Sequence, residues 1–415
     1  MAAGQPGLRE LLRGGLDVLA ASISAGVGHT QAARAICNAI LAAHPGVRAV
    51  ERDIALDVPP WFRWIYRDSY HWLCGHAPAL YGYLFDRTDA PHRSAEGRLA
   101  RVDPFRISTI EPDEAGLFDR FEDAVESIAL VRMLSWLASR PPGVLLHTHF
   151  LLPQAIARYQ RSRGGSPPCA VRQAVCITDY EVHRSWLAGG VDRWFVASEL
   201  AAGTLEVLGV ERGRIELTGI PLDRRWSSPV DRPAVRRAWG LDADRFVILM
   251  TGGASFVTRG FQRMIAACLR AVPEAHVVLL AGRNRRLQRV AERLTAAFPL
   301  LRVVPFTDRV HELMGAADVL VTKPGGLTTS EALCAGLPMV LVNPIPGQED
   351  RNADYLLSKG VAVRVRHPRM LPIHLRLLAC EPGLRCDMGQ RARRLARPDA
   401  ADRIAAWAVQ QLDRG

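Results

Sequence analysis

The chain repeats one pattern twice: a short apolar run, a glycine-containing turn, and a longer stretch with the spacing of an amphipathic helix. In the first half, the apolar run 16–23 leads into Gly26-Val27-Gly28-His29 and then into a helix-like segment that ends near residue 44. Parallel strands are buried on both faces and have continuous apolar sequences, so this order predicts an open parallel sheet. Further strand candidates in this half are residues 143–146, 174–177 and 194–196.

The same rhythm restarts in the second half, after a segment typical of an interdomain linker. Residues 218–233 hold three prolines and two serines. A chain of 415 residues exceeds the size of a single hydrophobic core, so we expect two Rossmann-like domains, 1–222 and 234–380, with ligands between their strand ends. Helices in 381–415 are expected to pack back across both domains. The strand candidates of the second half are 246–250, 276–280, 301–304, 319–322 and 339–342.

Composition narrows the class of protein. Apolar residues make up 48% and charged residues 23%, which is typical of globular domains. No apolar run reaches the roughly 18 residues of a spanning helix, and Arg9, Glu10 and Arg13 interrupt the start of the chain. We therefore expect a cytoplasmic protein, peripheral on the inner face of the membrane. The formal charge of +11 favours anionic partners.

Metal binding is not expected. The eight cysteines include no CxxC pair, so a zinc site lacks its usual short ligand spacing. Asp242-Ala243-Asp244 has the DxD spacing of metal-dependent glycosyltransferases, but it follows Gly240-Leu241 and is interpreted as a turn before a strand. We expect neither a metal nor a cofactor.

The glycine turn before the first helix places a titratable imidazole at a strand end. His29 is a candidate general base, because an imidazole changes protonation near neutral pH. A dinucleotide fingerprint would need a third glycine where the chain has Gln31, so nicotinamide binding is not indicated.

The segment Thr322-Lys323-Pro324-Gly325-Gly326 opens a helix that continues with three hydroxyl residues, Thr328, Thr329 and Ser330. Free N–H groups and the positive end of a helix dipole favour an anion such as a diphosphate. Glu331, farther along this helix, suits the hydroxyls of a ribose. The lysine precedes the glycines, so this is not a P-loop.

At these residues the sequence resembles the lipid-directed members of glycosyltransferase family 28, the monogalactosyldiacylglycerol synthases and processive diacylglycerol β-glucosyltransferases. The resemblance covers roughly positions 15–365. It implies a GT-B fold, with two Rossmann-like domains facing each other across a cleft. It also implies inverting transfer of a hexose from a UDP-sugar, with the acceptor in the N-terminal domain and the donor in the C-terminal domain. The motifs are GVGHTQAA from Gly26, TDYEVH from Thr178, TKPGGLTTSEAL from Thr322, and NPIPGQEDRNA from Asn343.

The family's donor contacts carry over to strand ends of the second domain. The resemblance assigns the diphosphate contacts to Gly325, Gly326, Thr328 and Thr329, and the ribose acceptor to Glu331. It assigns the partners of the sugar hydroxyls to Gln348 and Glu349. It assigns a second donor loop to Gly252, Gly253 and Ser255, and the uracil position to Phe306. Lys323, with Arg351, would stabilise the departing diphosphate without Mg²⁺.

The first candidate for the catalytic base, or for the organiser of the acceptor site, is His29, and the second is Asp179. Asp179 and His183 lie one turn apart if that stretch is helical, and a carboxylate could then orient the imidazole; the alternative is a surface pair. Val27 departs from the plant-like pattern, where glycine is common, and moves the resemblance toward the bacterial processive enzymes.

A third of the aromatic residues gather in one short stretch. Nine of the 28 Trp, Tyr and Phe residues lie between Pro59 and Asp86, interleaved with arginines and histidines. This composition is typical of a surface at a lipid headgroup, although an ordinary aromatic core is the alternative. Nucleic-acid binding is not expected, because no binding motif accompanies the patch.

The sequence thus predicts transfer of glucose or galactose to diacylglycerol, with a possible second transfer to the product. A GlcNAc transferase acting on a polyprenyl-diphosphate acceptor and a UDP-sugar 2-epimerase share the expected fold. A non-catalytic sensor of lipid or UDP-sugar would keep the same donor motif. The identity of the hexose, processivity, lipid activators and oligomeric state do not follow from the sequence.

Overall fold

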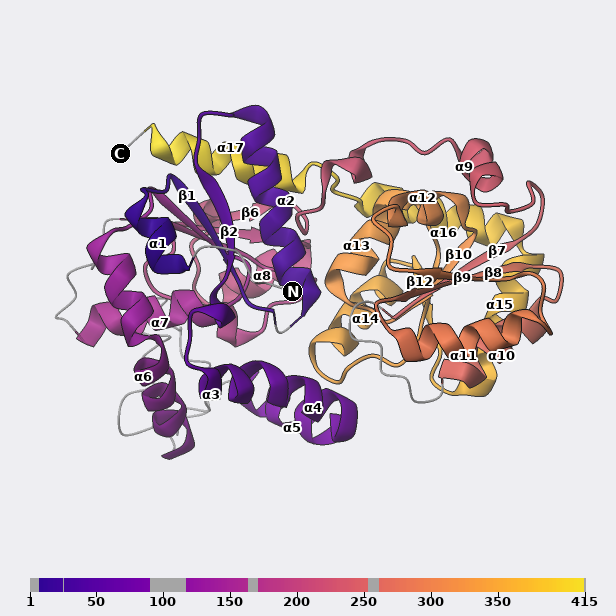
Figure 1. Cartoon of the computed structure of the whole chain (residues 1–415), viewed down its shortest axis with the longest axis horizontal. Coiled ribbons are helices and arrows are strands. Elements are labelled where there is room, and N and C mark those ends of the chain that lie inside the picture. The colour runs from indigo at the N-terminus through magenta and orange to yellow at the C-terminus, as the bar shows by residue number, and fades with distance from the viewer. Residues whose placement is uncertain (1–6, 25, 90–116, 163–170, 253–260, 414–415) are drawn as a thin grey trace. The chain divides into compact units, whose positions relative to one another are not determined.

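The structure is a computed structural model that describes residues 7–24, 26–89, 117–162, 171–252 and 261–413. It divides into two compact units (Figure 1). Residues 224–398 form the second unit, and the first unit combines the chain up to Asp223 with the C-terminal segment from Asp399. The last helix therefore belongs to the first unit, although it follows the second in sequence.

The first unit is built on a parallel sheet of six strands in the order β2-β1-β3-β4-β5-β6. Successive side chains of its central strands point to opposite faces, as the period of two requires. Val144 and Leu146 pack into one core layer and Leu145 into the other. The strands are β1 (Val18–Ser22), β2 (Ala49–Asp53), β3 (Val144–His147), β4 (Arg172–Cys176), β5 (Arg193–Val196) and β6 (Ile215–Leu217).

Helices cover both faces of this sheet. On one face α2 (Val27–Ala43) packs beside α17 (Ala400–Leu412), so the second and the last helix of the chain share one layer (Figure 1). Residues of α1 (Leu8–Arg13), α6 (Leu117–Ser139) and α7 (Leu151–Ser162) form the layer on the other face. A further helix, α8 (Glu199–Val207), packs against β5 and β6.

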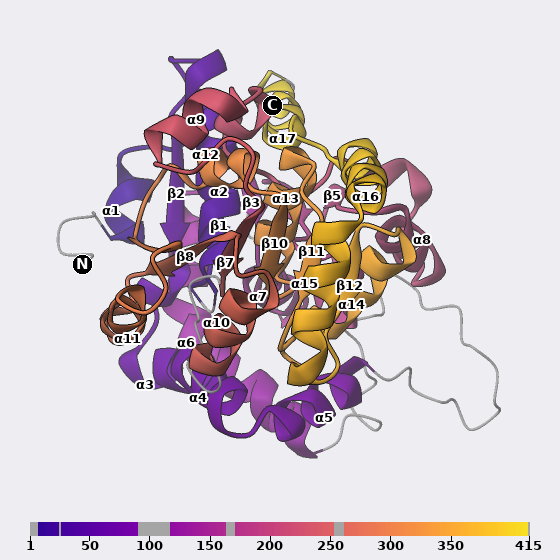
Figure 2. The same ribbon diagram turned by 90° about the vertical axis from the view of Figure 1, so that its right-hand side faces the viewer.

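The second unit repeats the architecture with a parallel sheet in the order β12-β11-β10-β7-β8-β9. Helices α10 and α15 pack against each other on one face (Figure 2). The strands are β7 (Val247–Thr251), β8 (His276–Gly282), β9 (Leu301–Pro305), β10 (Val319–Thr322), β11 (Met339–Leu341) and β12 (Ala362–Arg364). The helices are α9 (Arg232–Ala238), α10 (Phe261–Ala271), α11 (Arg285–Thr295), α12 (Val310–Ala316), α13 (Gly326–Ala335), α14 (Gln348–Ser358), α15 (Leu371–Cys380) and α16 (Pro382–Leu395).

Both sheets confirm the expected doubly wound architecture, and both have a point where the strand order reverses. In the first unit this point lies between β1 and β3, and in the second between β7 and β10. Ligands of open α/β sheets bind at the carboxyl ends of the strands that flank this point. The loops that follow these four strands are therefore the places to look for function.

Three strands were not indicated by the sequence pattern: β2, β6 and β12. Each lies at the edge of its sheet. An edge strand is buried less completely than a central strand, and β2 (AVERD) accordingly carries three charged residues in five. Continuous apolar runs therefore marked the centre of each sheet and missed these edges.

The aromatic stretch forms a run of short helices that projects from the body of the first unit (Figure 1). It consists of α3 (Pro60–Arg63), a π-helical turn (Trp64–Asp68), α4 (Ser69–His76) and α5 (Pro78–Asp89). Among the described residues, no helix is long and apolar enough to cross a membrane.

Candidate active site

The switch point of the first unit brings His29 against the end of β3. His29 lies in the first turn of α2, immediately after the glycine turn, and its Nδ1 is 2.6 Å from the carbonyl oxygen of Thr148. The Thr148 hydroxyl in turn donates to the carbonyl of His29 at 2.9 Å. These two bonds join the loops after β1 and β3 at the place where a ligand of this fold is expected.

The partners of His29 fix which ring nitrogen carries the proton. A carbonyl oxygen only accepts hydrogen bonds, so His29 Nδ1 must be the donor to Thr148. The Thr178 hydroxyl, 3.1 Å from the same nitrogen, shares that proton as a second acceptor. Nε2 of the neutral ring is left with a lone pair, which is the arrangement that a general base needs.

The surroundings of His29 keep its ring neutral. Burial lowers the pKa of His29 to about 4, and the bond to Thr148 opposes this only in part. The location of the ring at the positive end of α2 works in the same direction as burial. At neutral pH the Nε2 lone pair is therefore available.

Aromatic rings enclose this imidazole. The ring of His149 meets it edge to face at 4.9 Å between centroids, and Trp186 lies at 6.3 Å. Tyr66, from the aromatic run, contacts His149 at 5.9 Å. His149 was not predicted from the sequence, although it follows an apolar run as His29 does.

The stretch that carries Asp179 and His183 is a loop rather than a helix. The helical spacing that would have paired the two side chains is therefore absent. His183 Nδ1 accepts from the backbone N–H of Ser185 at 3.0 Å, and Nε2 donates to the carbonyl of Phe85 in α5 at 3.2 Å. Asp179 is half-buried and follows Thr178, the residue whose hydroxyl contacts His29.

In the second unit, the loop from β10 into α13 presents an uncapped helix N-terminus. Gly325 is the N-cap, and no side chain caps the first turn. Thr329 is fully buried, and its hydroxyl lies 3.0 Å from the carbonyl oxygen of Gly325 as a donor. Gly325 and Thr328 are half-buried, so their groups are more open to an incoming anion than those of Thr329 and the buried Gly326.

Glu331 lies one turn into α13 in a desolvated position. Burial raises its pKa to about 8, and the positive charge of Arg225 opposes that rise. The carboxyl is therefore mostly protonated at neutral pH in the unliganded protein. The ionised carboxyl can accept from two hydroxyls at once, so a diol bound here would favour loss of this proton.

Glu349 is committed to partners within the protein. Its Oε1 pairs with Lys323 Nζ at 3.1 Å, and its Oε2 accepts from the backbone N–H of Ile345 at 2.8 Å. Both side chains of the pair are largely buried. The pair ties the turn before α14 to the end of β10, while the half-buried Gln348 begins α14.

That turn requires glycine at its last position. Gly347 has φ 91° and ψ −114°, a conformation that residues with a Cβ avoid. The unusual backbone lets the chain reverse between β11 and α14, directly beside the Lys323–Glu349 pair.

Phe306 follows β9 and is 61% exposed. The guanidinium of Arg283, which follows the neighbouring strand β8, lies 4.4 Å from the centre of its ring. Gly252 is buried at the end of β7, and Gly253 and Ser255 lie outside the described residues. The described residues that the resemblance assigns to the donor thus follow β7, β9, β10 and β11, at the carboxyl ends of these strands.

The carboxylate of Asp242, in the DxD-like segment, is paired with basic neighbours. It pairs with Arg245 and lies 3.3 Å from Nε2 of His276. Its carboxylate supports the turn before β7, as the sequence interpretation had it.

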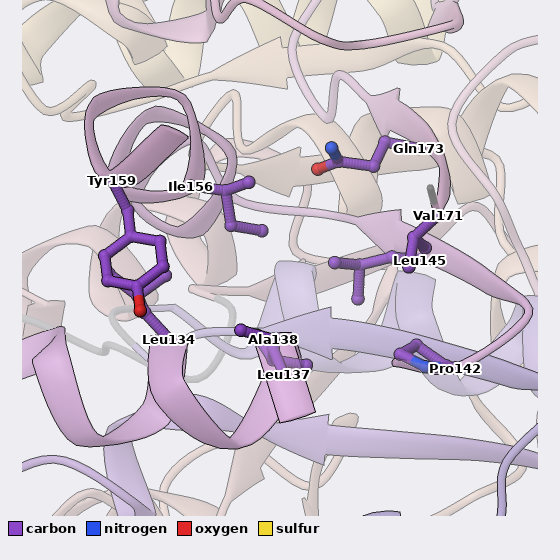
Figure 3. A pocket seen from close by; sticks show the side chains of 9 residues that line it. All are labelled: Leu134, Leu137, Ala138, Pro142, Leu145, Ile156, Tyr159, Val171 and Gln173. Carbon is purple, nitrogen blue, oxygen red and sulfur yellow. The ribbon is translucent and has the colours of Figure 1, made fainter. Parts of the chain in front are cut away.

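A hollow in the first unit has a different character from these strand-end sites. Figure 3 shows nine lining side chains, of which Tyr159 and Gln173 carry polar atoms. The amide oxygen of Gln173 accepts from His147 at 3.1 Å, and the amide nitrogen donates to Gly190 at 3.5 Å. The hollow is packing space between α6, α7 and the sheet.

Comparison with known families matches the two halves of the chain separately. Residues 115–222 match the family described as monogalactosyldiacylglycerol (MGDG) synthase, and residues 247–376 match the glycosyltransferase family 28 C-terminal domain. The chain is 35% identical over 188 residues to the processive diacylglycerol beta-glucosyltransferase of Staphylococcus carnosus, covering 45% of this chain and 48% of that protein. The Bacillus licheniformis protein of the same name is 29% identical over 245 residues, covering 59% of this chain and 62% of that protein.

The chain spans about half the length of the first curated relatives it matches. Solved structures agree over nearly the whole chain at low identity. The glycotransferase of kitacinnamycin has a TM-score of 0.60 at 16% identity, covering 95% of this chain and 98% of that one. Acinetobacter baumannii MurG has a TM-score of 0.56 at 16% identity, covering 95% and 99%.

The S. aureus MnaA–UDP structure has a TM-score of 0.60 at 12% identity, covering 94% of both chains. These likenesses establish the fold alone. With the two family matches, they show that this chain has the GT-B fold, with one segment that matches the monogalactosyldiacylglycerol synthase family and another that matches the C-terminal domain of glycosyltransferase family 28.

Proposed function

We propose that the protein transfers a hexose, glucose or galactose, from a UDP-sugar to the free hydroxyl of diacylglycerol, with inversion at the anomeric carbon. The observation that carries this proposal is the hydrogen bonding of His29, which leaves Nε2 as a bare base at the switch point of the first unit. The names of relatives supply the substrate class: both curated relatives described above are named processive diacylglycerol beta-glucosyltransferases.

The proposed reaction is a single displacement. The O–H bond of the acceptor breaks and its proton passes to His29 Nε2. The freed electron pair on oxygen forms the new bond to the anomeric carbon, and the bond from that carbon to the diphosphate oxygen breaks, with its electron pair leaving on UDP. General-base assistance of this kind contributes about 10²- to 10⁴-fold in rate.

The donor would bind along the strand ends of the second unit. The open N–H groups at the start of α13 and the positive charge of Lys323 suit the diphosphate. Glu331 suits the ribose, and the exposed Phe306 marks the place proposed for uracil. Gln348 is proposed as a partner of the sugar hydroxyls, while Glu349 would act mainly through Lys323.

We expect UDP departure to need no divalent cation. Preorganised donors aimed at developing charge can replace a metal, because they need no reorganisation during the reaction. The helix N-terminus and Lys323 supply such donors here. Initial rates that are the same in EDTA and in added Mg²⁺ would agree with this, whereas loss of turnover in EDTA restored by Mg²⁺ would contradict it.

The aromatic run is proposed to dock on an anionic membrane surface, where the acceptor resides. Trp64, Trp72 and Tyr83 are each more than half exposed, whereas Phe62 is buried against the sheet domain. The His183–Phe85 hydrogen bond ties α5 to the loop that carries Thr178. This run would therefore connect the bilayer with the neighbourhood of His29.

The experiment is an incubation of the purified protein with labelled UDP-glucose, UDP-galactose and UDP-GlcNAc in turn, with diacylglycerol in anionic mixed micelles. Lipid extraction and mass analysis should show a hexosyl-diacylglycerol with one donor, and higher oligomers if the enzyme is processive. Label in a polyprenyl-diphosphate lipid, or a released epimeric sugar nucleotide, would instead support the GlcNAc transferase or the 2-epimerase. UDP binding without turnover of any donor would support a sensor.

A further inference from the structure

The two imidazoles at the switch point of the first unit hold their protons on opposite nitrogens. His29 donates from Nδ1 to the carbonyl of Thr148, so its Nε2 is bare. His149 Nδ1 accepts from the backbone N–H of Leu151 at 3.2 Å, so the proton of its neutral ring sits on Nε2. At Nε2, His29 therefore offers a hydrogen-bond acceptor, whereas His149 offers a donor.

The neutral form of His149 is strongly favoured. Burial, and then the proximity of His29, hold the pKa of His149 well below its ordinary value. Protonation at Nδ1 would also break the bond to the first N–H of α7. The ring thus remains an Nε2–H donor throughout the physiological pH range.

This donor is left unused by the protein. None of the described residues provides an acceptor for its Nε2–H. His149 is only 6% exposed as a whole, yet its Nε2 is not one of the fully buried unpartnered atoms, so the donor opens outward from the core. An open donor of this kind is satisfied by water until a ligand takes the place of that water. The carboxyl end of β3 is where the fold places ligands.

Neighbouring aromatic rings fix the direction of this donor. Phe150 stacks on His149 at 4.2 Å, and Tyr66 and Trp186 meet the ring at 5.9 and 6.4 Å. With Nδ1 already tied to Leu151, the ring has little freedom to turn. Its Nε2–H is preorganised before any substrate arrives.

We propose that His149 is an acceptor-orienting residue whose Nε2–H donates to the ester oxygen next to the reacting hydroxyl. This inference rests on the proposed function. A hydrogen bond to the reacting oxygen itself would withdraw electron density from the nucleophile. A bond to the neighbouring oxygen instead anchors the glycerol backbone while the hydroxyl points its proton at His29. The partner class is an alcohol that carries an adjacent ester.

Two substitutions separate this role from the capping of α7. In His149→Asn, the amide oxygen can take the place of Nδ1 and accept from Leu151, but the distal donor is lost. In His149→Gln, the amide nitrogen can take the place of Nε2, but the near acceptor is lost. H149N should therefore keep the melting temperature and lose turnover, whereas H149Q should lower the melting temperature and retain more turnover.

The expected loss in H149N is roughly 10- to 100-fold in kcat/KM for diacylglycerol, the range for one hydrogen bond in a desolvated site. UDP affinity should be unchanged. With a long-chain primary alcohol that lacks the adjacent ester, wild type and H149N should turn over equally. The matched control is His367→Asn, because His367 Nδ1 accepts from the N–H of Arg369 at 3.3 Å in the same local geometry, on the surface of the second unit.

Several outcomes would overturn the inference. One is full diacylglycerol turnover by H149N, and another is a parallel fall of activity and melting temperature in both variants, which would show a purely structural role. An equal loss with the ester-free alcohol would place the hydrogen bond elsewhere. If wild type itself forms no glycolipid with any donor, the proposed function fails as well, and that result is distinguishable because it precedes any variant.

Discussion

Each unit has a six-stranded parallel sheet with a switch point, although the strand orders differ, and the two units place opposite chemistry there. In the first unit the loops after β1 and β3 bring together neutral imidazoles and aromatic rings. In the second the loop after β10 brings a lysine to an uncapped helix N-terminus. Under the proposed function, the same type of sheet carries a desolvated base in one unit and an anion site in the other. The topology determines where a site forms, and the loop residues determine what it does.

Removal of the base should give the largest effect. His29→Ala should lower kcat by about 10²- to 10⁴-fold, because general-base assistance is lost, while UDP affinity stays near that of wild type. Calorimetric titration with UDP and steady-state kinetics measure the two quantities separately. Full turnover by this variant would remove His29 from the mechanism.

The pH profile of the wild-type enzyme sharpens this test. A base acts in its unprotonated form, so activity should fall as the pH drops through its pKa. The acid limb should therefore lie near pH 4 rather than near 6.5, since burial lowers the pKa of His29 to about 4. An acid limb near pH 6.5 that persists in His29→Ala would belong to another group.

The next largest effect is expected at the ribose position of the second unit. Glu331→Ala should weaken UDP binding by roughly 10- to 100-fold, the range for hydrogen bonds to a charged group. Lower activity with unchanged UDP affinity would contradict the ribose assignment. Because the free carboxyl has a pKa of about 8, binding that favours the carboxylate should release a proton, and affinity should rise with pH toward 8.

The same carboxyl makes a prediction about stability, with the opposite sign from an ordinary glutamate. Its pKa is higher in the folded than in the unfolded chain, where it is about 4.3. The unfolded chain therefore binds fewer protons in this interval, and the free energy of unfolding should decrease as the pH rises from about 4.3 to 8. Glu331→Gln should remove that decrease, which melting curves across this pH range would detect.

A smaller effect is expected at the ion pair behind the diphosphate loop. Lys323→Met should weaken UDP binding about tenfold and lower the melting temperature, because it leaves the Glu349 carboxylate buried without its cation. Glu349→Gln in the same chain should recover part of the melting temperature and none of the affinity. Recovery of both would show that Lys323 acts only through Glu349.

The sequence predicted the central strands of each sheet better than the edge strands. It predicted the candidate sites only in part. Continuous apolar runs revealed the central strands, whereas the edge strand β2 carries charges that hide it. The glycine turn identified His29, because a turn after a strand is visible locally. The Lys323–Glu349 pair joins side chains 26 positions apart, so no local pattern could show that Glu349 is held within the protein.

The Arg283–Phe306 contact shows the same limit at neighbouring strands. The two residues follow β8 and β9, which pair in parallel with Gly282 opposite Pro305. A contact between the loops that follow two neighbouring strands can be predicted only when the register of these strands is known. Periodicity reveals which residues are buried, but it does not provide that register.

The smallest effect is expected at the aromatic run, where the first unit differs most from the second. Trp64→Ala and Trp72→Ala should each weaken binding to anionic vesicles about three- to tenfold, because each removes part of an exposed apolar surface. Turnover of a short-chain, water-soluble diacylglycerol should be unchanged. Ile373→Ala, which removes an exposed apolar side chain from α15 in the second unit, is the control and should leave vesicle binding unchanged.

Charge and apolar contact can be separated in the same assay. If basic residues such as Arg63 supply most of the attraction, raising the salt concentration should release wild type and the tryptophan variants alike, since each close basic residue contributes about 1 kcal/mol at an anionic surface. If the tryptophans supply it, wild type should resist salt that releases the variants. Equal vesicle binding by all variants at every salt concentration would move the membrane contact away from the aromatic run.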